Sequence, residues 1–294
     1  MRKYLRYADV LVLFTGALGL FLRLLLRLAG TDDRGLYPAN HPAWIILCIL
    51  SILFIAFLWL LTRDVGADQR YKRNFPASLP GAVGNLAGAV GLAVAAFDSR
   101  GTELLHLLTF PFGIAAAAGL ALAAFCRFSG RKPHFLCHAL PAGFFALRIF
   151  VLGQALGAEP EIHRFLFEML ASLAMIPACY QLWGFDVDQG RREKSLFWSL
   201  TAAYLSIVAI VGMENWMFYL CMTLWLLCNL CTLKYLPKRT RPATENAEEI
   251  TEESLPATTE IVENSTETPT DPVETLDTDA IFADILRKID ENVD

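Results

Sequence analysis

Long apolar runs fill most of the first 236 residues and constrain the fold more than any other feature of the chain. Lipid offers the backbone no hydrogen-bond partner, so a hydrocarbon core about 30 Å thick is crossed by a helix of roughly 20 apolar residues. We therefore expect an all-α, polytopic transmembrane helix bundle of about eight spans. The expected spans are 8–29, 42–62, 79–97, 104–126, 135–156, 161–183, 196–213 and 216–236.

The basic residues alternate between the predicted loops. Cytoplasmic loops accumulate Lys and Arg because these residues resist export. Of the 25 basic residues, seventeen fall on one predicted side of the bundle, in segments 2–6, 63–73, 127–132, 191–194 and 234–241. The loops of the other side hold only Arg34, Arg100 and Arg164. The pattern predicts a multi-pass protein of the plasma membrane with both termini in the cytoplasm.

Two of the predicted inner loops resemble each other. Residues 64–70 read DVGADQR and residues 186–191 read DVDQGR, and each follows the second span of a four-span half. Because both halves would start on the same side, a duplication would give a parallel 4+4 repeat. The alternative is that short inner loops converge on Asp, Gly, Gln and Arg.

The end of the chain differs in composition from the bundle. We divide the chain into a membrane domain (1–236), an acidic, disordered cytoplasmic linker (237–277) and a short amphipathic helix (278–294). The linker is expected to be disordered because it has too little apolar surface to offset the conformational entropy lost on ordering it. The last segment places apolar residues on one helical face, which predicts a docking surface for a cytoplasmic protein through residues 278–291. These residues are Ile281, Phe282, Ile285, Leu286 and Ile289.

Three charged residues stand out deep inside the predicted spans. A buried charge in a membrane is costly and marks a candidate site or a structural ion pair. Arg148 and Glu168 fall at equal depth in antiparallel neighbouring spans, which predicts an ion pair between them. Arg23 falls at a similar depth, so the three residues would create a positive pocket in the outer half if they converge.

Other polar residues near the outer surface are weaker candidates. Gln154 and His106 join the set of ligand or ion-pair candidates, and either His106 or His163 could act beside Glu168. We expect no catalytic motif, metal or cofactor, since neither the histidines nor Cys228 and Cys231 form a recognised ligand set. The inner half offers fewer polar groups, namely Asn85, Gln181 and Asn229.

Small residues concentrate in the third and fourth predicted spans. Gly81, Gly84, Gly88 and Gly91 share roughly one face of the third span. Small residues let helix backbones approach closely. We therefore expect these two spans to form the crowded centre of the bundle.

Three classes of function remain open. The first is a membrane-anchored regulatory or interaction protein that presents the tethered docking helix. The second is a transporter or channel for a small, anionic solute, built on the Arg-rich outer half. The third is an intramembrane enzyme, which no motif supports. The expected partners are the lipid bilayer and the cytoplasmic protein, not nucleic acid; no oligomeric state is predicted.

Overall fold

The computed structural model describes residues 7–29, 41–63, 65, 70–99, 104–158, 162–211 and 215–234. These residues form helices joined by turns and short loops. The helices are α2 (Ala8–Ala29), α3 (Pro42–Thr62), α4 (Tyr71–Asn74), α5 (Leu79–Asp98), α6 (Leu104–Ser129), α7 (Leu136–Ala158), α8 (Ile162–Asp186), α9 (Arg192–Ala209) and α10 (Trp216–Lys234). The predicted linker and docking helix lie outside the described residues.

The expectation of a helical membrane bundle is confirmed. Within the described residues, 6 helices are long and apolar enough to cross a membrane: α2, α3, α5, α6, α7 and α8. The last two helices differ, because α9 opens on the charged residues Arg192, Glu193 and Lys194, and the apolar part of α10 is the shorter segment Trp216–Cys231.

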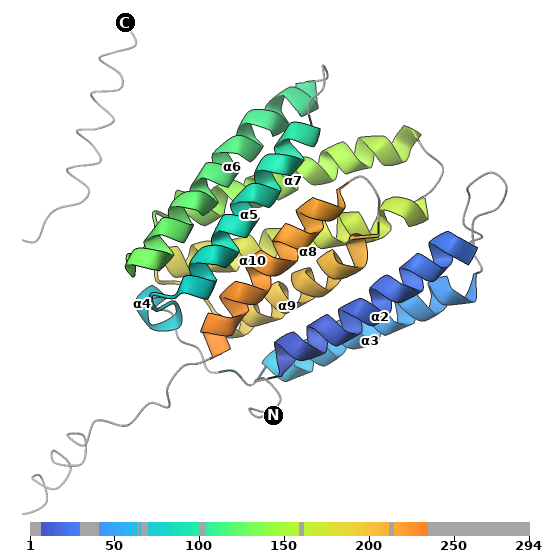
Figure 1. Cartoon of the computed structure of the whole chain (residues 1–294), viewed down its shortest axis with the longest axis horizontal. Coiled ribbons are helices and arrows are strands. Elements are labelled where there is room, and N and C mark those ends of the chain that lie inside the picture. Colours follow the sequence, from blue (N-terminus) through green and yellow to red (C-terminus); the bar gives the residue numbers. More distant parts are fainter. Residues whose placement is uncertain are drawn as a thin grey trace, which may run out of the picture. The chain divides into compact units, whose positions relative to one another are not determined.

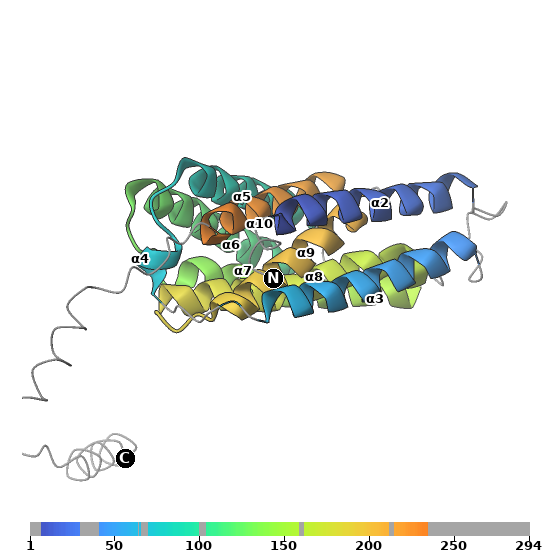
Figure 2. The same cartoon turned by 90° about the horizontal axis from the view of Figure 1, so that it is seen from below.

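Six helices pack in a closed ring. Each helix from α5 to α10 contacts the next one in the chain, and α10 returns to pack against α5. The α2–α3 hairpin lies outside the ring, where both of its helices contact α9 (Figure 1). The long helices run along a common direction, with the short helix α4 at one end (Figure 2). We call this end the α4 end.

Helix α9 is the buried element of this arrangement. Every residue from Ser199 to Ala209 is buried, since α2, α3, α8 and α10 all pack around this helix. No residue of this stretch is charged, so the stretch can be packed on all sides. Its Tyr204 hydroxyl shares a 2.8 Å hydrogen bond with Ser51 of α3. Helix α9 therefore belongs to the crowded part of the bundle, together with the third and fourth spans expected there.

The glycine face of α5 packs against α10. A Cβ atom at Gly84 would lie 2.4 Å from Cys228 Cβ, and one at Gly91 would lie 2.7 Å from Cys221 Cβ. Neither separation is possible between real carbon atoms, so these positions require glycine at this helix spacing. The predicted close approach is real, and its partner is the last helix of the ring.

The predicted boundaries hold for most spans but not for the seventh. Helix α9 runs from Arg192 to Ala209, about one turn earlier than the predicted range 196–213. Arg, Glu and Lys have high helix propensity although they are unfavourable inside a membrane, and this accounts for the earlier start of α9. At the other end of α9, guanidinium groups of α2 bind carbonyls at and beyond the last turn.

The two halves of the chain pack differently. Helix α8 packs against α9, whereas the equivalent pair in the first half, α3 and α5, is not among the packed pairs. In the compared loops, the structure describes only Val65 and Arg70 of segment 64–70. The 4+4 repeat therefore stays a prediction.

Candidate functional site

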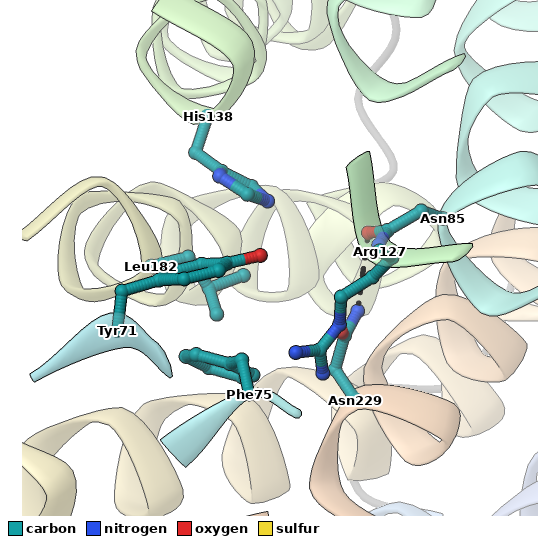
Figure 3. Close-up of a pocket in the computed structure, with 7 residues that line it drawn as sticks. All are labelled: Tyr71, Phe75, Asn85, Arg127, His138, Leu182 and Asn229. Atoms are coloured by element: carbon teal, nitrogen blue, oxygen red, sulfur yellow. Dashed lines mark hydrogen bonds between the residues drawn. The ribbon is translucent and has the colours of Figure 1, made fainter. Parts of the chain in front are cut away.

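A pocket opens at the α4 end, where five long helices and α4 meet. The space inside it that admits a water-sized group is about 10 Å³, close to the least that holds one water molecule. In this conformation the pocket therefore has room only for a very small group. Its lining residues, shown in Figure 3, are Tyr71, Phe75, Asn85, Arg127, His138, Leu182 and Asn229.

Arg127 supplies the permanent positive charge of the pocket. It lies in the last turn of α6, which ends at Gly130 with φ +67° and a hydrogen bond from Arg131 N–H to the Cys126 carbonyl. This is the geometry of a Schellman cap. The side chain turns inward beside Gly81, where a Cβ atom would lie 2.9 Å from Arg127 Nε. Its guanidinium carbon lies 4.3 Å from the centre of the Phe75 ring.

Tyr71 enters the pocket from α4, which the loop after α8 holds in place. Asp188 accepts a 2.8 Å hydrogen bond from the Tyr71 backbone N–H, and its carboxylate also binds Lys132. The Lys132 hydrogen bond, followed by that of Tyr71, lowers the pKa of Asp188, which keeps this exposed carboxylate ionised. Burial raises the pKa of the Tyr71 hydroxyl, so it stays protonated and available as a donor.

Asp188 makes this contact from a backbone conformation that is rare for residues other than glycine. Its φ is 58°, in the left-handed region. The Gln189 N–H donates to the Gly184 carbonyl at 2.7 Å, so Asp188 occupies the position that ends α8. Asp tolerates this conformation better than most residues do. The loop thereby joins the end of α8 to α4 and to the loop that carries Lys132.

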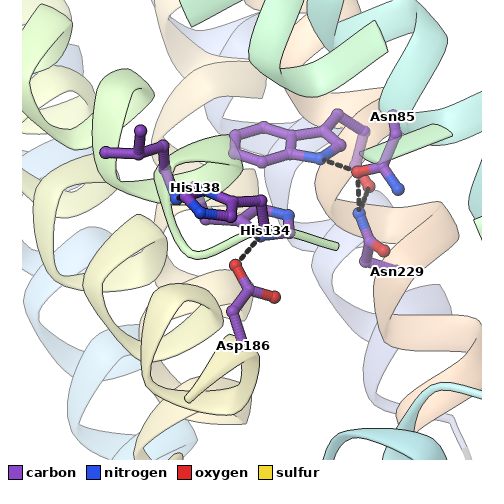
Figure 4. A network of polar contacts seen from close by, with 7 residues as sticks. Asn85, His134, His138, Asp186 and Asn229 are labelled. Carbon is purple, nitrogen blue, oxygen red and sulfur yellow. Dashed lines mark hydrogen bonds and ion pairs between the residues drawn. The ribbon is translucent and has the colours of Figure 1, made fainter. Parts of the chain in front are cut away.

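A buried histidine and carboxylate form the second ionisable element. His138 Nδ1 lies 2.6 Å from Asp186 Oδ2, and both residues are buried (Figure 4). Asp186 fixes the orientation of the ring and favours a proton on Nδ1. The ring can then present Nε2 to other groups as an acceptor when it is neutral and as a donor when it is protonated.

Two asparagines complete the polar lining. Asn85 Oδ1 accepts hydrogen bonds from Trp225 Nε1 at 2.7 Å and from Asn229 Nδ2 at 3.3 Å. Asn229 Nδ2 also donates to the Trp225 carbonyl at 3.0 Å. These bonds connect α5 to α10 beside their glycine contact, so the packing of the two helices positions the pocket floor.

The lining side chains of the pocket carry one permanent positive charge, the guanidinium of Arg127. No carboxylate is among the described lining residues, but the Asp186 carboxylate, bonded to His138, is close enough for its charge to act on Arg127 and Tyr71. The other lining groups that can donate hydrogen bonds are the phenol of Tyr71 and the amide of Asn85, since both N–H groups of Asn229 already have acceptors. This set suits the binding of a small anion or the anionic end of a small solute.

The outer candidates Arg23 and Glu168 meet at the other end of the bundle. Arg23 Nη2 lies 3.9 Å from Glu168 Oε1, and Arg23 Nη1 donates a 2.9 Å hydrogen bond to the Val208 carbonyl. The last carbonyls of a helix have no partner within the helix and form its negative end. Arg23 therefore caps α9 from within the bundle. Arg27 reaches another carbonyl beyond the helix end, that of Val211, at 3.4 Å.

The predicted Arg148–Glu168 ion pair is absent among the described contacts. The guanidinium of Arg148 lies over the Phe218 ring, 4.5 Å from its centre. Glu168 instead lies against Arg23, because the position of α2 beside α9 brings Arg23 to the same depth. Arg148 and Glu168 lie at similar depth, but the rotation of each helix about its axis decides which residues meet.

The remaining candidates lie apart from the pocket at the α4 end and from the Arg23–Glu168 contact. His106 Nδ1 is 3.0 Å from the Ser99 carbonyl in the neighbouring loop, and Gln154 is exposed. The side chain of His163 lies outside the described part of the structure. In the described residues, no group of three or more His, Cys, Asp and Glu could hold a metal ion.

The sequence identifies some of the residues that line the pocket, but it does not predict that they lie side by side. It identifies Asn85 and Asn229 as polar groups of the inner half, but it assigns Arg127 to a solvated loop. Tyr71 lies between predicted spans, where the apolar pattern gives no signal. One usable signal is present: Arg127 and His138 lie near the facing ends of successive spans, at the same depth as the asparagines.

The chain was compared with protein families, with curated proteins and with solved structures, and none of the three comparisons finds a match.

Proposed function

We propose that this integral membrane protein binds a small anionic solute, or the anionic end of one, in the pocket at the α4 end. The observation that carries the proposal is the Arg127 guanidinium in the lining of a small pocket at the end of a membrane helix bundle, beside the donors Tyr71 and Asn85. Ionisable residues in membrane segments commonly mark ligand and ion pathways. The function belongs with the transport and solute-sensing classes.

The pocket geometry favours binding over chemistry. Nucleophilic or acid–base catalysis requires a nucleophile beside a base, or a pair of acids, near a substrate atom. Besides His138, the lining groups that can donate to a ligand are Arg127, Tyr71 and Asn85.

We further propose that all eight long helices span the plasma membrane and that both termini are cytoplasmic. Helix α9 is about 27 Å long at 1.5 Å per residue, which is close to the thickness of a hydrocarbon core. Basic residues gather in the loops at the α4 end, so the pocket would open to the cytoplasm. A reporter protein fused after residue 215 is expected to lie outside the cell; a cytoplasmic reporter would contradict this topology.

The docking function of residues 278–294 remains a separate proposal. Its support is the amphipathic spacing of the segment and its acidic tether. The pocket at the α4 end supports the solute-binding function instead. This pocket lies at the opposite end of the bundle from the predicted Arg-rich outer pocket. A parallel 4+4 repeat is also retained only as a proposal, on the strength of the two similar loops.

Replacing Arg127 tests the solute-binding proposal. We expect inorganic phosphate to raise the unfolding temperature of the full-length protein in detergent at constant ionic strength. In Arg127→Gln the apparent Kd should rise about tenfold or more, because a charge-assisted hydrogen bond contributes about 1.5–3 kcal/mol. Tyr71→Phe removes a single donor and should produce a smaller loss.

Arg131→Gln is the matched control for this experiment. Arg131 lies four residues further along the chain and is exposed, so its loss changes the net charge equally without altering the pocket. We expect this variant to bind phosphate like the wild type. Equal weakening in Arg127→Gln and Arg131→Gln, or no phosphate effect on any of the proteins, would refute anion binding in the pocket.

A further inference from the structure

Four buried polar atoms gather in the half of the bundle away from the α4 end. They are Arg148 Nε, Arg148 Nη2, Ser172 Oγ and Tyr219 Oη, and none of the four has a hydrogen-bond partner within the described structure. Arg148 is 4% exposed, and Ser172 and Tyr219 are each 1% exposed. Leaving one such group unsatisfied is costly, so a cluster of four indicates an occupant.

The three residues converge from three helices. The guanidinium carbon of Arg148 in α7 lies 5.9 Å from the centre of the Tyr219 ring in α10. The Tyr219 hydroxyl is close to Arg148 and to Ser172 of α8, although in neither case do the atoms meet hydrogen-bond geometry. Arg148 Nε and Nη2 lie on the same edge of the guanidinium, so their N–H bonds point in parallel. All four atoms can donate a hydrogen bond.

The charge of the cluster is also unbalanced. Glu168 lies one turn before Ser172 on α8, and its described ion pair is with Arg23. Within the described residues, no carboxylate oxygen lies within 4.0 Å of the Arg148 guanidinium, which rests on Phe218. An isolated cation is expensive to bury in a membrane, and a water molecule would satisfy donors without neutralising it.

We propose that Arg148, Ser172 and Tyr219 form a binding site for one small inorganic anion of halide size. Convergence of the donors around a single hydroxyl favours a monatomic anion over a larger carboxylate or phosphate. The site goes beyond the solute-binding pocket and does not rest on it. Tyr219 and Asn229 are ten residues apart on α10, which separates the two sites by about 15 Å along the helix.

Bromide is the probe for this site. Full-length protein in detergent should unfold at a temperature about 3 °C higher in sodium bromide than in sodium gluconate of equal ionic strength. The double variant Ser172→Ala/Tyr219→Phe should lose most of this difference. In gluconate the variant should be at least as stable as the wild type, because each substitution removes an unsatisfied hydroxyl. Crystals soaked in bromide should show an anomalous peak between Arg148 and Tyr219.

Two control variants distinguish bromide binding at this site from a general effect of the salt or of losing a buried hydroxyl. Tyr204→Phe removes a buried hydroxyl that already has a partner, so it should lower stability in both salts and keep the full bromide response. Arg127→Gln should also keep this response, which distinguishes failure of the pocket proposal from failure of this one. An unchanged bromide effect in the double variant would overturn the proposal. Density for water alone at the site, without a bromide effect, would do so as well.

Discussion

Replacing Arg23 by methionine should lower the free energy of unfolding by about 3–5 kcal/mol, the usual cost of breaking a buried ion pair from one side. Glu168 would lose its positive neighbour while it remains buried, and the Val208 carbonyl would lose its donor. Both side chains are under one-tenth exposed, so solvent offers little compensation. Reversible unfolding in mixed detergent, followed by circular dichroism, measures the change.

A double-mutant cycle isolates the pair. Adding Glu168→Met to Arg23→Met should restore part of the lost stability, because the buried carboxylate that has lost Arg23 is removed. Arg27→Met is the matched control one turn further along α2. Its longer 3.4 Å contact and partial burial predict a loss of under about 1 kcal/mol. Strictly additive losses for Arg23 and Glu168 would show that the two residues do not interact.

Replacing Gly84 by alanine should lower the free energy of unfolding by about 1–3 kcal/mol, the typical cost of overpacking. The added Cβ would lie 2.4 Å from Cys228 Cβ and 3.3 Å from the Trp225 carbonyl oxygen. The second contact is with backbone, so a rotamer change cannot relieve it, and α5 must move away from α10. Gly84→Val should be more destabilising still.

The same shift should disturb the pocket. Asn85 follows Gly84 directly and bonds to Trp225 and Asn229 across the helix contact. Gly153→Ala is the control, since nothing lies within 4 Å of its added Cβ and alanine is the better helix former. This variant should be as stable as the wild type or more stable by up to about 1 kcal/mol. Equal losses at Gly84 and Gly153 would contradict close packing of α5 on α10.

The predictable part of the fold is the part set by local pattern. Span length, apolar composition and the glycine face of α5 follow from periods within one segment. The depth of a residue follows from its distance to the nearest loop, and on this basis Arg23 and Glu168 fall at the same level. The structure brings both residues into contact.

The unpredictable part depends on how helices rotate and pair. Equal depth makes Arg148 and Glu168 look like partners, but the guanidinium of Arg148 faces Phe218 of α10. Helix α9 carries charges at its start and has the pattern of a marginal span, yet its second half is buried on all sides. The pocket requires Tyr71, a loop residue, to meet Arg127 from another helix, and no periodicity within either segment contains that contact.

The closed ring also sets an order of events for the growing chain. The glycine face of α5 is complete by residue 98, but its partner α10 begins only at residue 216. At a synthesis rate of about 5–20 residues per second, α5 waits on the order of ten seconds before that partner is made. During this interval the glycine-lined face of α5 is open to contact with other helices. The Asn85 side chain on the same helix has no Trp225 or Asn229 to bond with until α10 is made.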